Sequence, residues 1–130
     1  MKSLTIILSL LIGLSSCIIE VELDPPYIAI GNIDEYETKE VFHEIWSDGV
    51  LIYEEAEYHA WLEIEFHNTG GLRAEHISVE VIFYNGRHEI QTITIYLPSI
   101  HSGNFYKYSL DTGFKSIYDY TDYEVYVYWE

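Results

Sequence analysis

Apolar and polar residues alternate along most of this 130-residue chain with a period of two, the period of a β-strand that has one solvated face. The clearest run extends from Tyr58 to His67. Further runs cover residues 19–24, 77–84, 92–97 and 123–130, and Tyr, Ile, Val and Thr, which favour half-buried pleated surfaces, dominate them. Residues 33–46 come nearest to a helical pattern, but their composition favours a strand or a mixed loop.

Turn-forming residues separate these runs at the intervals that an antiparallel sheet requires. Asn68-Thr69-Gly70-Gly71 ends the strand that starts at Tyr58, and Ser102-Gly103-Asn104 opens a later one. Tyr84-Asn85-Gly86-Arg87 predicts a hairpin with positive φ at Asn-Gly. Pro98 ends the strand that reaches Leu97, because proline cannot donate to a strand ladder.

The spacing of strands and turns predicts an all-β fold. Several short strands on a chain of this length are typical of an antiparallel β-sandwich. The alternation also predicts which side chains form the shared core of the two sheets: Leu62, Ile64, Phe66, Val79, Val81, Ile95 and Val127.

The N-terminus follows a different pattern. Residues 4–14 form an apolar run with the length of a secretory signal core, too short to span a bilayer comfortably, and Lys2 precedes it. Leu14-Ser15-Ser16-Cys17 follows and contains the single cysteine of the chain. This order resembles the signal peptide of bacterial lipoproteins, which implies cleavage after Ser16 and lipidation of Cys17. The alternative is an ordinary secretory signal with a stray thiol, which an oxidising compartment disfavours.

The resemblance to lipoproteins implies a domain organisation and a location. Residues 1–16 would be the signal peptide, residues 17–26 the lipidated cysteine and a short tether, and residues 27–130 the β-sandwich domain. Asp24-Pro25-Pro26 is the best candidate for a stiff spacer. Two or three acyl chains would anchor the protein lastingly. Ile18 differs from the aspartate that marks inner-membrane retention in enteric bacteria, which favours the outer membrane.

The charge narrows the possible partners. The chain has 22 acidic and six basic residues, a formal net charge of −16. Because residues 1–16 hold one basic residue and no acidic one, the remainder has a formal charge of −17. Such a surface repels phosphate groups, which excludes nucleic acid and anionic lipid headgroups as favoured partners.

Three segments combine strand and turn signals in a recognisable order. Trp61–Gly71 is a strand that ends in Asn-x-Gly, Ala74–Gly86 is a strand of alternating valines followed by an aromatic pair and a glycine turn, and Leu97–Gly103 contains a later glycine turn. Together they resemble the immunoglobulin-like modules of the FxLYD and CARDB kind in bacterial envelope proteins. The resemblance covers roughly residues 58–110 and implies an antiparallel immunoglobulin-like or fibronectin-III-like β-sandwich of about seven strands, located in the bacterial envelope. Its motifs are turns and core positions, so it implies no catalytic residue.

Candidate chemistry is sparse. The chain has no glycine-rich phosphate loop, no G-x-S-x-G elbow and no H-E-x-x-H motif, so we expect no enzyme and no resident cofactor. His59 and His67 share a polar strand face with Glu63 and Glu65, and His76 could approach His88 across neighbouring strands. A transition-metal site from such a set is conceivable. The favoured interpretation is that the histidines are solvated strand residues.

One loop has the composition of a weak Ca²⁺ candidate. Asp111, Asp119 and Asp122 bracket a segment between two strands, and Ca²⁺ prefers carboxylate and carbonyl oxygens. The segment lacks the spacing and the closing glutamate of an EF-hand. Aspartates that end strands and solvate a loop are the favoured interpretation.

Tyrosine is abundant, with 13 residues, and four tyrosines are predicted to share an outer face: Tyr84, Tyr96, Tyr126 and Tyr128. Exposed tyrosines can stack on sugars or anchor a protein partner. The alternative is an aromatic ladder that stabilises the sheet. We therefore expect a lipid-anchored bacterial envelope protein that acts as a non-enzymatic interaction or structural module, with a ligand-binding accessory protein for a glycan or Ca²⁺ as the alternative.

Overall fold

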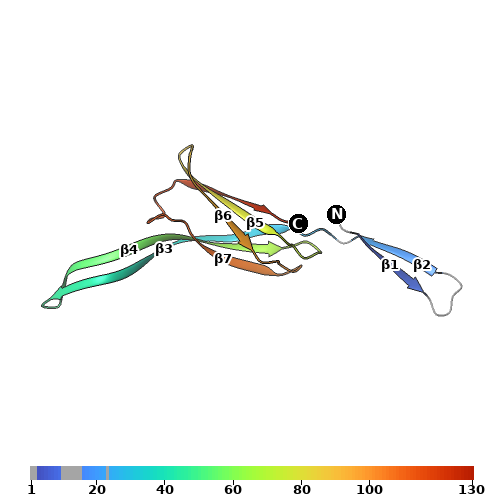
Figure 1. Cartoon of the computed structure of the whole chain (residues 1–130), viewed down its shortest axis with the longest axis horizontal. Coiled ribbons are helices and arrows are strands. Elements are labelled where there is room, and N and C mark those ends of the chain that lie inside the picture. The colour runs from blue at the N-terminus through green and yellow to red at the C-terminus, as the bar shows by residue number, and fades with distance from the viewer. Residues whose placement is uncertain (1–2, 10–15, 23) are drawn as a thin grey trace.

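The computed structural model describes residues 3–9, 16–22 and 24–130, with side chains from Asp24 onward. All regular elements in these residues are strands (Figure 1). Their bounds are β1 Ser3–Ser9, β2 Ser16–Glu22, β3 Ile28–Ser47, β4 Val50–Asn68, β5 Ile77–Asn85, β6 His88–Leu97, β7 Phe105–Asp111 and β8 Asp122–Tyr128. Among the described residues, no helix has the length and apolar character needed to cross a membrane.

The strands form antiparallel sheets, as the alternation predicts. Two sheets have three strands each, in the orders β3-β4-β7 and β6-β5-β8, and β1 pairs with β2 separately. The prediction of about seven strands in two sheets is therefore wrong: six strands form them. The run at residues 19–24 contributes to β2, whose backbone pairs with β1 instead of joining either three-stranded sheet.

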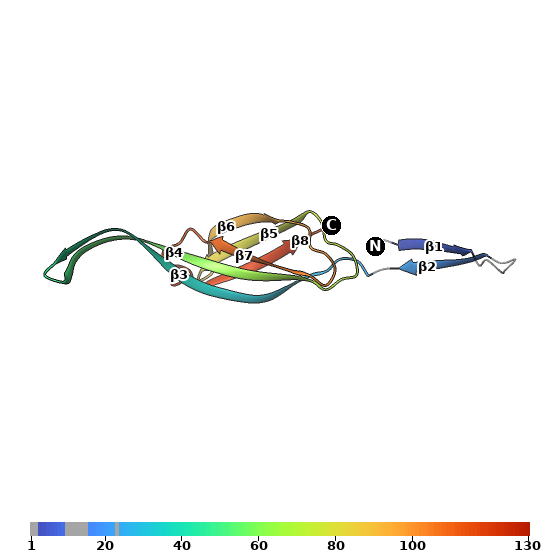
Figure 2. The ribbon, with the colours of Figure 1, turned by 90° about the horizontal axis from the view of Figure 1, so that it is seen from below.

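Buried side chains of both three-stranded sheets belong to one hydrophobic cluster, and Figure 2 shows the two sheets as separate layers. Leu62, Ile64 and Phe66 of β4 are fully buried, while the residues between them are partly exposed. The predicted register of β4 is therefore correct. The other predicted core residues are confirmed as well: Val79, Val81 and Ile95 are buried, and Val127 packs against the cluster.

The glycine turn after β5 differs from its prediction by one position. Asn85 pairs with His88, so the two loop residues are Gly86 and Arg87. Gly86 has φ 65°, whereas Asn85 has no positive φ. A glycine with positive φ at the first loop position is typical of a type II′ turn, whose twist matches that of the flanking strands.

Asn68, at the end of β4, is a buried polar junction. It is 1% exposed, and its amide nitrogen donates to the carbonyl oxygens of Leu72 (2.7 Å) and Ile100 (2.9 Å). Its amide oxygen accepts from the backbone N–H groups of Gly70 (3.0 Å) and Tyr27 (3.3 Å). One side chain thereby joins the entry to β3, the turn after β4 and the connection between β6 and β7.

Residues 24–27 lie against the turn that follows Asn68. Asp24 accepts a backbone hydrogen bond from Gly71 (3.1 Å), and Pro26 accepts one from the indole of Trp129 (2.8 Å). A Cβ on Gly70 would lie 2.1 Å from the carbonyl oxygen of Pro25, so only glycine fits there. The segment expected as a spacer is therefore attached to the body of the domain from Asp24 onward.

We predict that Asn68→Ala lowers the free energy of unfolding by about 2 to 4 kcal/mol, because four backbone groups lose their partner and part of them stays buried. Denaturant titration of the full chain measures this loss. Asn104→Ala is the matched control, since the Asn104 side chain is exposed, and it should change stability by less than about 0.5 kcal/mol. Equal effects of the two substitutions would contradict the role of Asn68.

Candidate functional site

The most distinctive surface is a hairpin that projects from the body. β7 pairs with β4 only from Trp61 to His67, whereas β3 and β4 continue to pair as far as Ser47 and Val50. Residues 39–58, hereafter the arm, therefore form a two-stranded ribbon, which Figures 1 and 2 show extending away from the sheets. At the rise of a β-strand, its length is about 30 Å.

The turn at the tip of the arm explains why this segment folds as one hairpin. Asp48 and Gly49 have φ 48° and 76°, and Ser47 pairs with Val50. Positive φ at both loop residues defines the type I′ turn that an Asp-Gly pair favours. Residues 33–46, expected as a strand or mixed loop, belong to β3, and the Asp-Gly pair after Ser47 is the sequence signal that makes β3 and β4 one hairpin.

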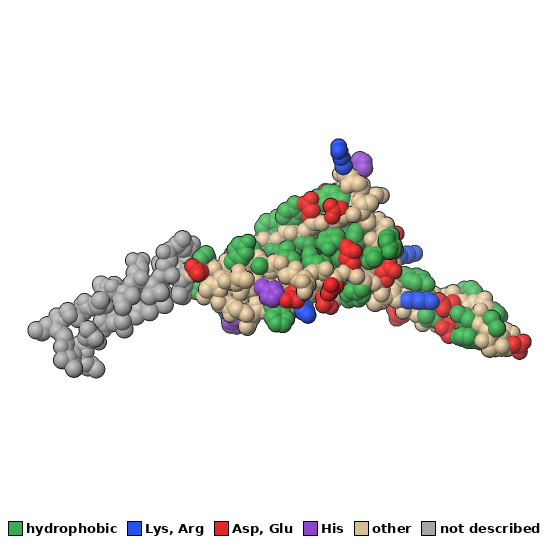
Figure 3. Space-filling model, turned by 180° about the vertical axis from the view of Figure 1, so that it is seen from behind, with side chains coloured by type: hydrophobic (Ala, Val, Ile, Leu, Met, Phe, Trp, Pro, Cys, Tyr) green, Lys and Arg blue, Asp and Glu red, His purple; other side chains and the backbone are tan. Residues whose placement is uncertain are grey.

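The arm exposes apolar side chains on a scale that the body does not. Every residue in it is exposed except Glu54 and Ala56, which are half-buried. Its exposed large apolar residues are Val41, Phe42, Ile45, Trp46, Val50, Leu51, Ile52, Tyr53 and Tyr58. On the face of the arm that Figure 3 shows, apolar side chains are interspersed with carboxylates. A concentration of exposed apolar side chains on one projecting element is a mark of interaction sites in soluble proteins.

Two register shifts place additional apolar residues on the arm. The pairing skips Phe42 between Val41 and His43, and it skips Ile52 on the opposite strand. These two residues are 59% and 61% exposed. Because a bulge interrupts alternation and increases the local twist, it presents apolar side chains that a regular ribbon would not.

The arm is strongly acidic. Its one basic residue, Lys39, forms an ion pair with Glu54 on the opposite strand, and its ammonium lies 5.9 Å from the ring centre of Tyr58. The hydrogen bond to Glu54 raises the pKa of Lys39. The arm carries six carboxylates against this single cation: Glu40, Glu44, Asp48, Glu54, Glu55 and Glu57.

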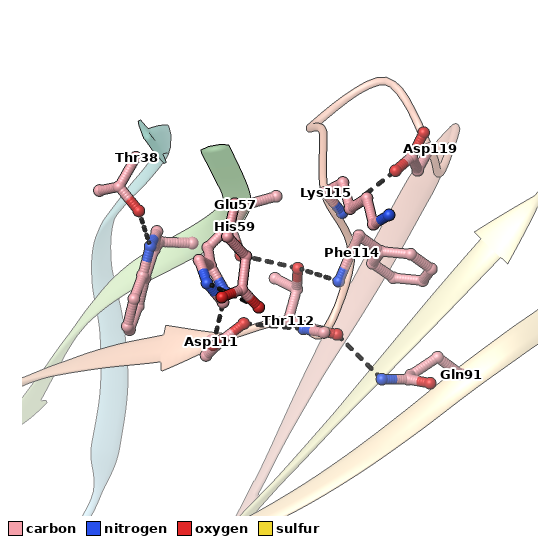
Figure 4. A network of polar contacts seen from close by, with 12 residues as sticks. Thr38, Glu57, His59, Gln91, Asp111, Thr112, Phe114, Lys115 and Asp119 are labelled. Carbon is pink, nitrogen blue, oxygen red and sulfur yellow. Dashed lines mark hydrogen bonds and ion pairs between the residues drawn. The ribbon is translucent and has the colours of Figure 1, made fainter. Parts of the chain in front are cut away.

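Thr112 sets the point at which the arm leaves the body. Its fully buried side chain donates to the carbonyl of Ala60 (2.7 Å) and accepts from the N–H of Phe114 (3.2 Å). Its own carbonyl accepts from the Gln91 amide on β6 (2.9 Å). These bonds, drawn in Figure 4, turn the chain away from β4 directly after β7. β4 therefore has no third-strand partner beyond this point within the described residues.

A histidine lies beside this junction. His59 Nδ1 is 3.2 Å from Asp111 Oδ2, and His59 Nε2 is 3.4 Å from Glu57 Oε1 (Figure 4). His59 and His67 lie on the same strand, β4, as expected, but eight residues of strand separate them by about 26 Å, so the two do not share one site. His67 instead contacts Glu65. His76 precedes β5, whereas His88 begins β6 and pairs with Asn85 at the far end of β5, so the predicted approach of these two histidines is wrong.

The three aspartates of the loop after β7 bind their own backbone. Asp111 accepts from the N–H of Gly113 (2.9 Å), and Asp119 accepts from those of Lys115 (3.2 Å) and Ser116 (3.0 Å). Asp122 accepts from the next N–H along the chain (2.8 Å). Their local role is to stabilise turns, which is the interpretation that the sequence favours.

The four predicted tyrosines lie on one sheet and on its outer face. Tyr96 of β6 and Tyr128 of β8 flank Ser78 of β5, and Tyr126 follows in the next row. Tyr96 is 79% exposed, whereas Tyr84 is half-buried and lies near the opposite end of β5. The hydrogen bond from Tyr126 to Glu124 raises the pKa of Tyr126 to about 12. The tyrosines thus form a row at one end of the sheet with Tyr84 apart from it.

The lipidation motif at Leu14–Cys17 lies outside the described side chains, so modification of Cys17 stays a prediction. In comparisons with family models, curated proteins and solved structures, nothing matches this chain. The functional argument therefore depends on the geometry of the arm, its base and the tyrosine face.

We predict that the arm contributes little to the stability of the body. The double substitution Phe42→Ser and Ile52→Ser should change the free energy of unfolding by no more than about 1 kcal/mol, because both side chains are exposed. Leu62→Ala, in the buried part of the same hairpin, should cost about 2 to 5 kcal/mol. Denaturant titration compares the variants, and an arm variant as damaging as Leu62→Ala would mean that the arm is packed in solution.

Proposed function

We propose that this chain is a lipid-anchored interaction module of the bacterial envelope, without catalytic activity, whose arm docks onto a protein partner. The observation that carries the proposal is the exposed apolar arm. An isolated two-stranded hairpin is marginally stable in water and gains stability from a third strand or a packed surface. A partner that covers the arm would supply a third strand and a packed apolar surface.

The chemistry of the arm defines the partner. The edge of β4 that β7 covers between Trp61 and His67 continues into the arm without a strand partner in the described part of the chain. Strand addition to such an edge provides main-chain hydrogen bonds, and alternate side chains provide specificity. Six carboxylates against one lysine favour a partner strand that carries basic residues between apolar ones.

The fold and the location belong to the same proposal. An immunoglobulin-like sandwich is supported by the single hydrophobic cluster that includes both three-stranded sheets and by the resemblance over residues 58–110. Anchoring to the outer membrane is supported by the Leu14–Cys17 motif and by Ile18 after it. In this arrangement the tether holds the domain at the membrane while the arm reaches away from the body.

Site-specific photo-crosslinking tests the docking function in the bacterium that encodes the chain. A photoreactive phenylalanine at Ile52, on the arm, is compared with one at Tyr118, which is 86% exposed on the body. We expect a discrete adduct with one protein from Ile52 and no matching adduct from Tyr118. Mass spectrometry of the adduct should locate the crosslink in an extended segment with basic residues.

Two further variants make the crosslinking result decisive. In the chain with the photoreactive residue at Ile52, the further substitution Trp46→Ser should abolish the adduct, because it removes a large apolar anchor from the tip of the arm. Converting both Tyr96 and Tyr128 to serine should leave the adduct unchanged. Absence of an adduct at Ile52, or equal adducts from Ile52 and Tyr118, would contradict docking through the arm.

The anchor has its own prediction. Cys17→Ser should prevent lipidation, so the chain should lose its acyl mass and move from the membrane to the soluble fraction. Intact mass and membrane fractionation measure the two effects. Unchanged retention of a variant that lacks the cysteine would show that another feature holds the chain at the membrane.

The tyrosine face supports a second candidate function, the recognition of a glycan. Tyr96 and Tyr128 are exposed on either side of Ser78, and aromatic rings of this kind stack on sugar rings. The Tyr96→Ser and Tyr128→Ser double variant separates the two functions. It would abolish binding to envelope polysaccharide if glycan recognition is the function, and it would leave arm crosslinks intact. Ca²⁺ at Asp111, Asp119 and Asp122 has less support, since these carboxylates bind local backbone.

A further inference from the structure

Three metal-ligating side chains converge at the base of the arm. Glu40 and Glu57 form a directly opposed pair on β3 and β4, and His59 lies two residues along β4, so all three project from the same face. Ligand atoms of the three side chains lie within 4.8 Å of one another. These residues come from two strands that the hairpin holds in a fixed register.

The local electrostatics disfavour this arrangement without a cation. Like charges directly opposed across an antiparallel pair are destabilising. In the described part of the chain, Glu57 forms an ion pair with His59, and the one lysine of the arm, Lys39, pairs with Glu54 on the other face of the ribbon. A divalent cation between Glu40 and Glu57 would convert this repulsion into attraction.

His59 is oriented as a metal ligand would be. Asp111 Oδ2 of β7 lies 3.2 Å from Nδ1 of His59, so a carboxylate of another strand faces Nδ1 while Nε2 faces Glu57. A carboxylate that holds the second ring nitrogen is the usual partner of a metal-bound histidine. This contact comes from a different strand and is independent of the Glu40–Glu57 pair.

The spacing of one ligand pair, His59 Nε2 and Glu57 Oε1, matches that of two ligands on a small transition-metal ion. His59 Nε2 and Glu57 Oε1 are 3.4 Å apart, longer than the roughly 2.7 to 2.9 Å of a charge-assisted hydrogen bond. Two ligand atoms on a tetrahedral Zn²⁺ with bonds of about 2.0 to 2.1 Å lie roughly 3.3 to 3.4 Å apart. Ca²⁺ prefers six to eight oxygens, and a set with one imidazole and two carboxylates does not provide them.

We infer that Glu40, Glu57 and Nε2 of His59 form a binding site for a divalent transition metal of the Zn²⁺ class, with Asp111 as the positioning residue for the imidazole. Water would complete the coordination, because the site faces solvent. The metal would link β3 to β4 where the arm leaves the body, and Asp111 would connect this link to β7. The inference does not depend on the docking function.

Isothermal titration with Zn²⁺ tests the site in the full chain, purified in mild detergent without a histidine tag. We expect one Zn²⁺ per chain and a higher melting temperature in its presence. Glu57→Gln and His59→Gln should each weaken binding at least tenfold and remove the thermal shift. Asp111→Asn should weaken binding roughly 10- to 100-fold, as loss of an orienting carboxylate does.

A matched pair on the same hairpin provides the control. His43 and Glu55 are opposed in the register of the arm, as Glu40 and Glu57 are. His43→Gln and Glu55→Gln should leave Zn²⁺ affinity unchanged. Without metal, Glu57→Gln should melt at or above the temperature of the unsubstituted chain, since one of two opposed charges is gone. Zn²⁺ binding that survives His59→Gln, tighter binding of Ca²⁺ than of Zn²⁺, or no binding by the unsubstituted chain would overturn the site.

Discussion

Burial of every second residue of β4 between Ala60 and Asn68 is the constraint on which the other features depend. This half of the strand places Leu62, Ile64 and Phe66 in the hydrophobic cluster, and a shift of one residue would exchange them for Glu63 and Glu65. A buried polar side chain secures each end: Asn68 at one end, and Thr112 against Ala60 at the other. Beyond Ala60 the same strand continues without a core, and the arm begins there.

One half of β4 is buried in the core and the other half is exposed in the arm. This exposure is energetically unfavourable and calls for an explanation. The exposed side chains of Phe42, Trp46 and Ile52 keep apolar surface in contact with water. The strand edge beside them has no partner, which adds a second unfavourable feature. Charged residues on the arm oppose self-association, because two copies would bring the same carboxylates together. The proposed docking to a partner of opposite charge would account for both properties, and the cluster at Glu40, Glu57 and His59 lies where rigidity of the arm would matter most.

Periodicity was sufficient to predict the part of the fold that local sequence determines. The all-β class, the register of β4, the core residues and the turns at Asn68, Pro98 and Gly103 follow from alternation and turn chemistry. The hairpin after β5 shifted by one residue because Gly86, and not the Asn85-Gly86 pair, takes the positive φ. The Asp48-Gly49 signal was present in the sequence, and it distinguishes one continuous hairpin from a strand followed by a loop.

Other features could not be predicted because they depend on contacts between distant segments. The meeting of His59 with Asp111 requires the pairing of β4 with β7, which alternation alone does not specify. Asn68 looked like a turn residue, yet its four hydrogen bonds reach three separate segments. The exposure of the arm likewise follows from where β7 stops and not from the composition of residues 39–58, whose apolar content would suit a buried strand equally well.

The central claim is that the chain combines a stable body with an arm that becomes protected only in a complex. Amide hydrogen exchange of the purified full chain tests it most directly, because exchange reports local opening strand by strand. The account predicts that amides of residues 41–57 exchange at least roughly a hundredfold faster than those of residues 62–66. Equal protection of the two halves of the hairpin would contradict it, since the arm would then be part of the folded core or already covered.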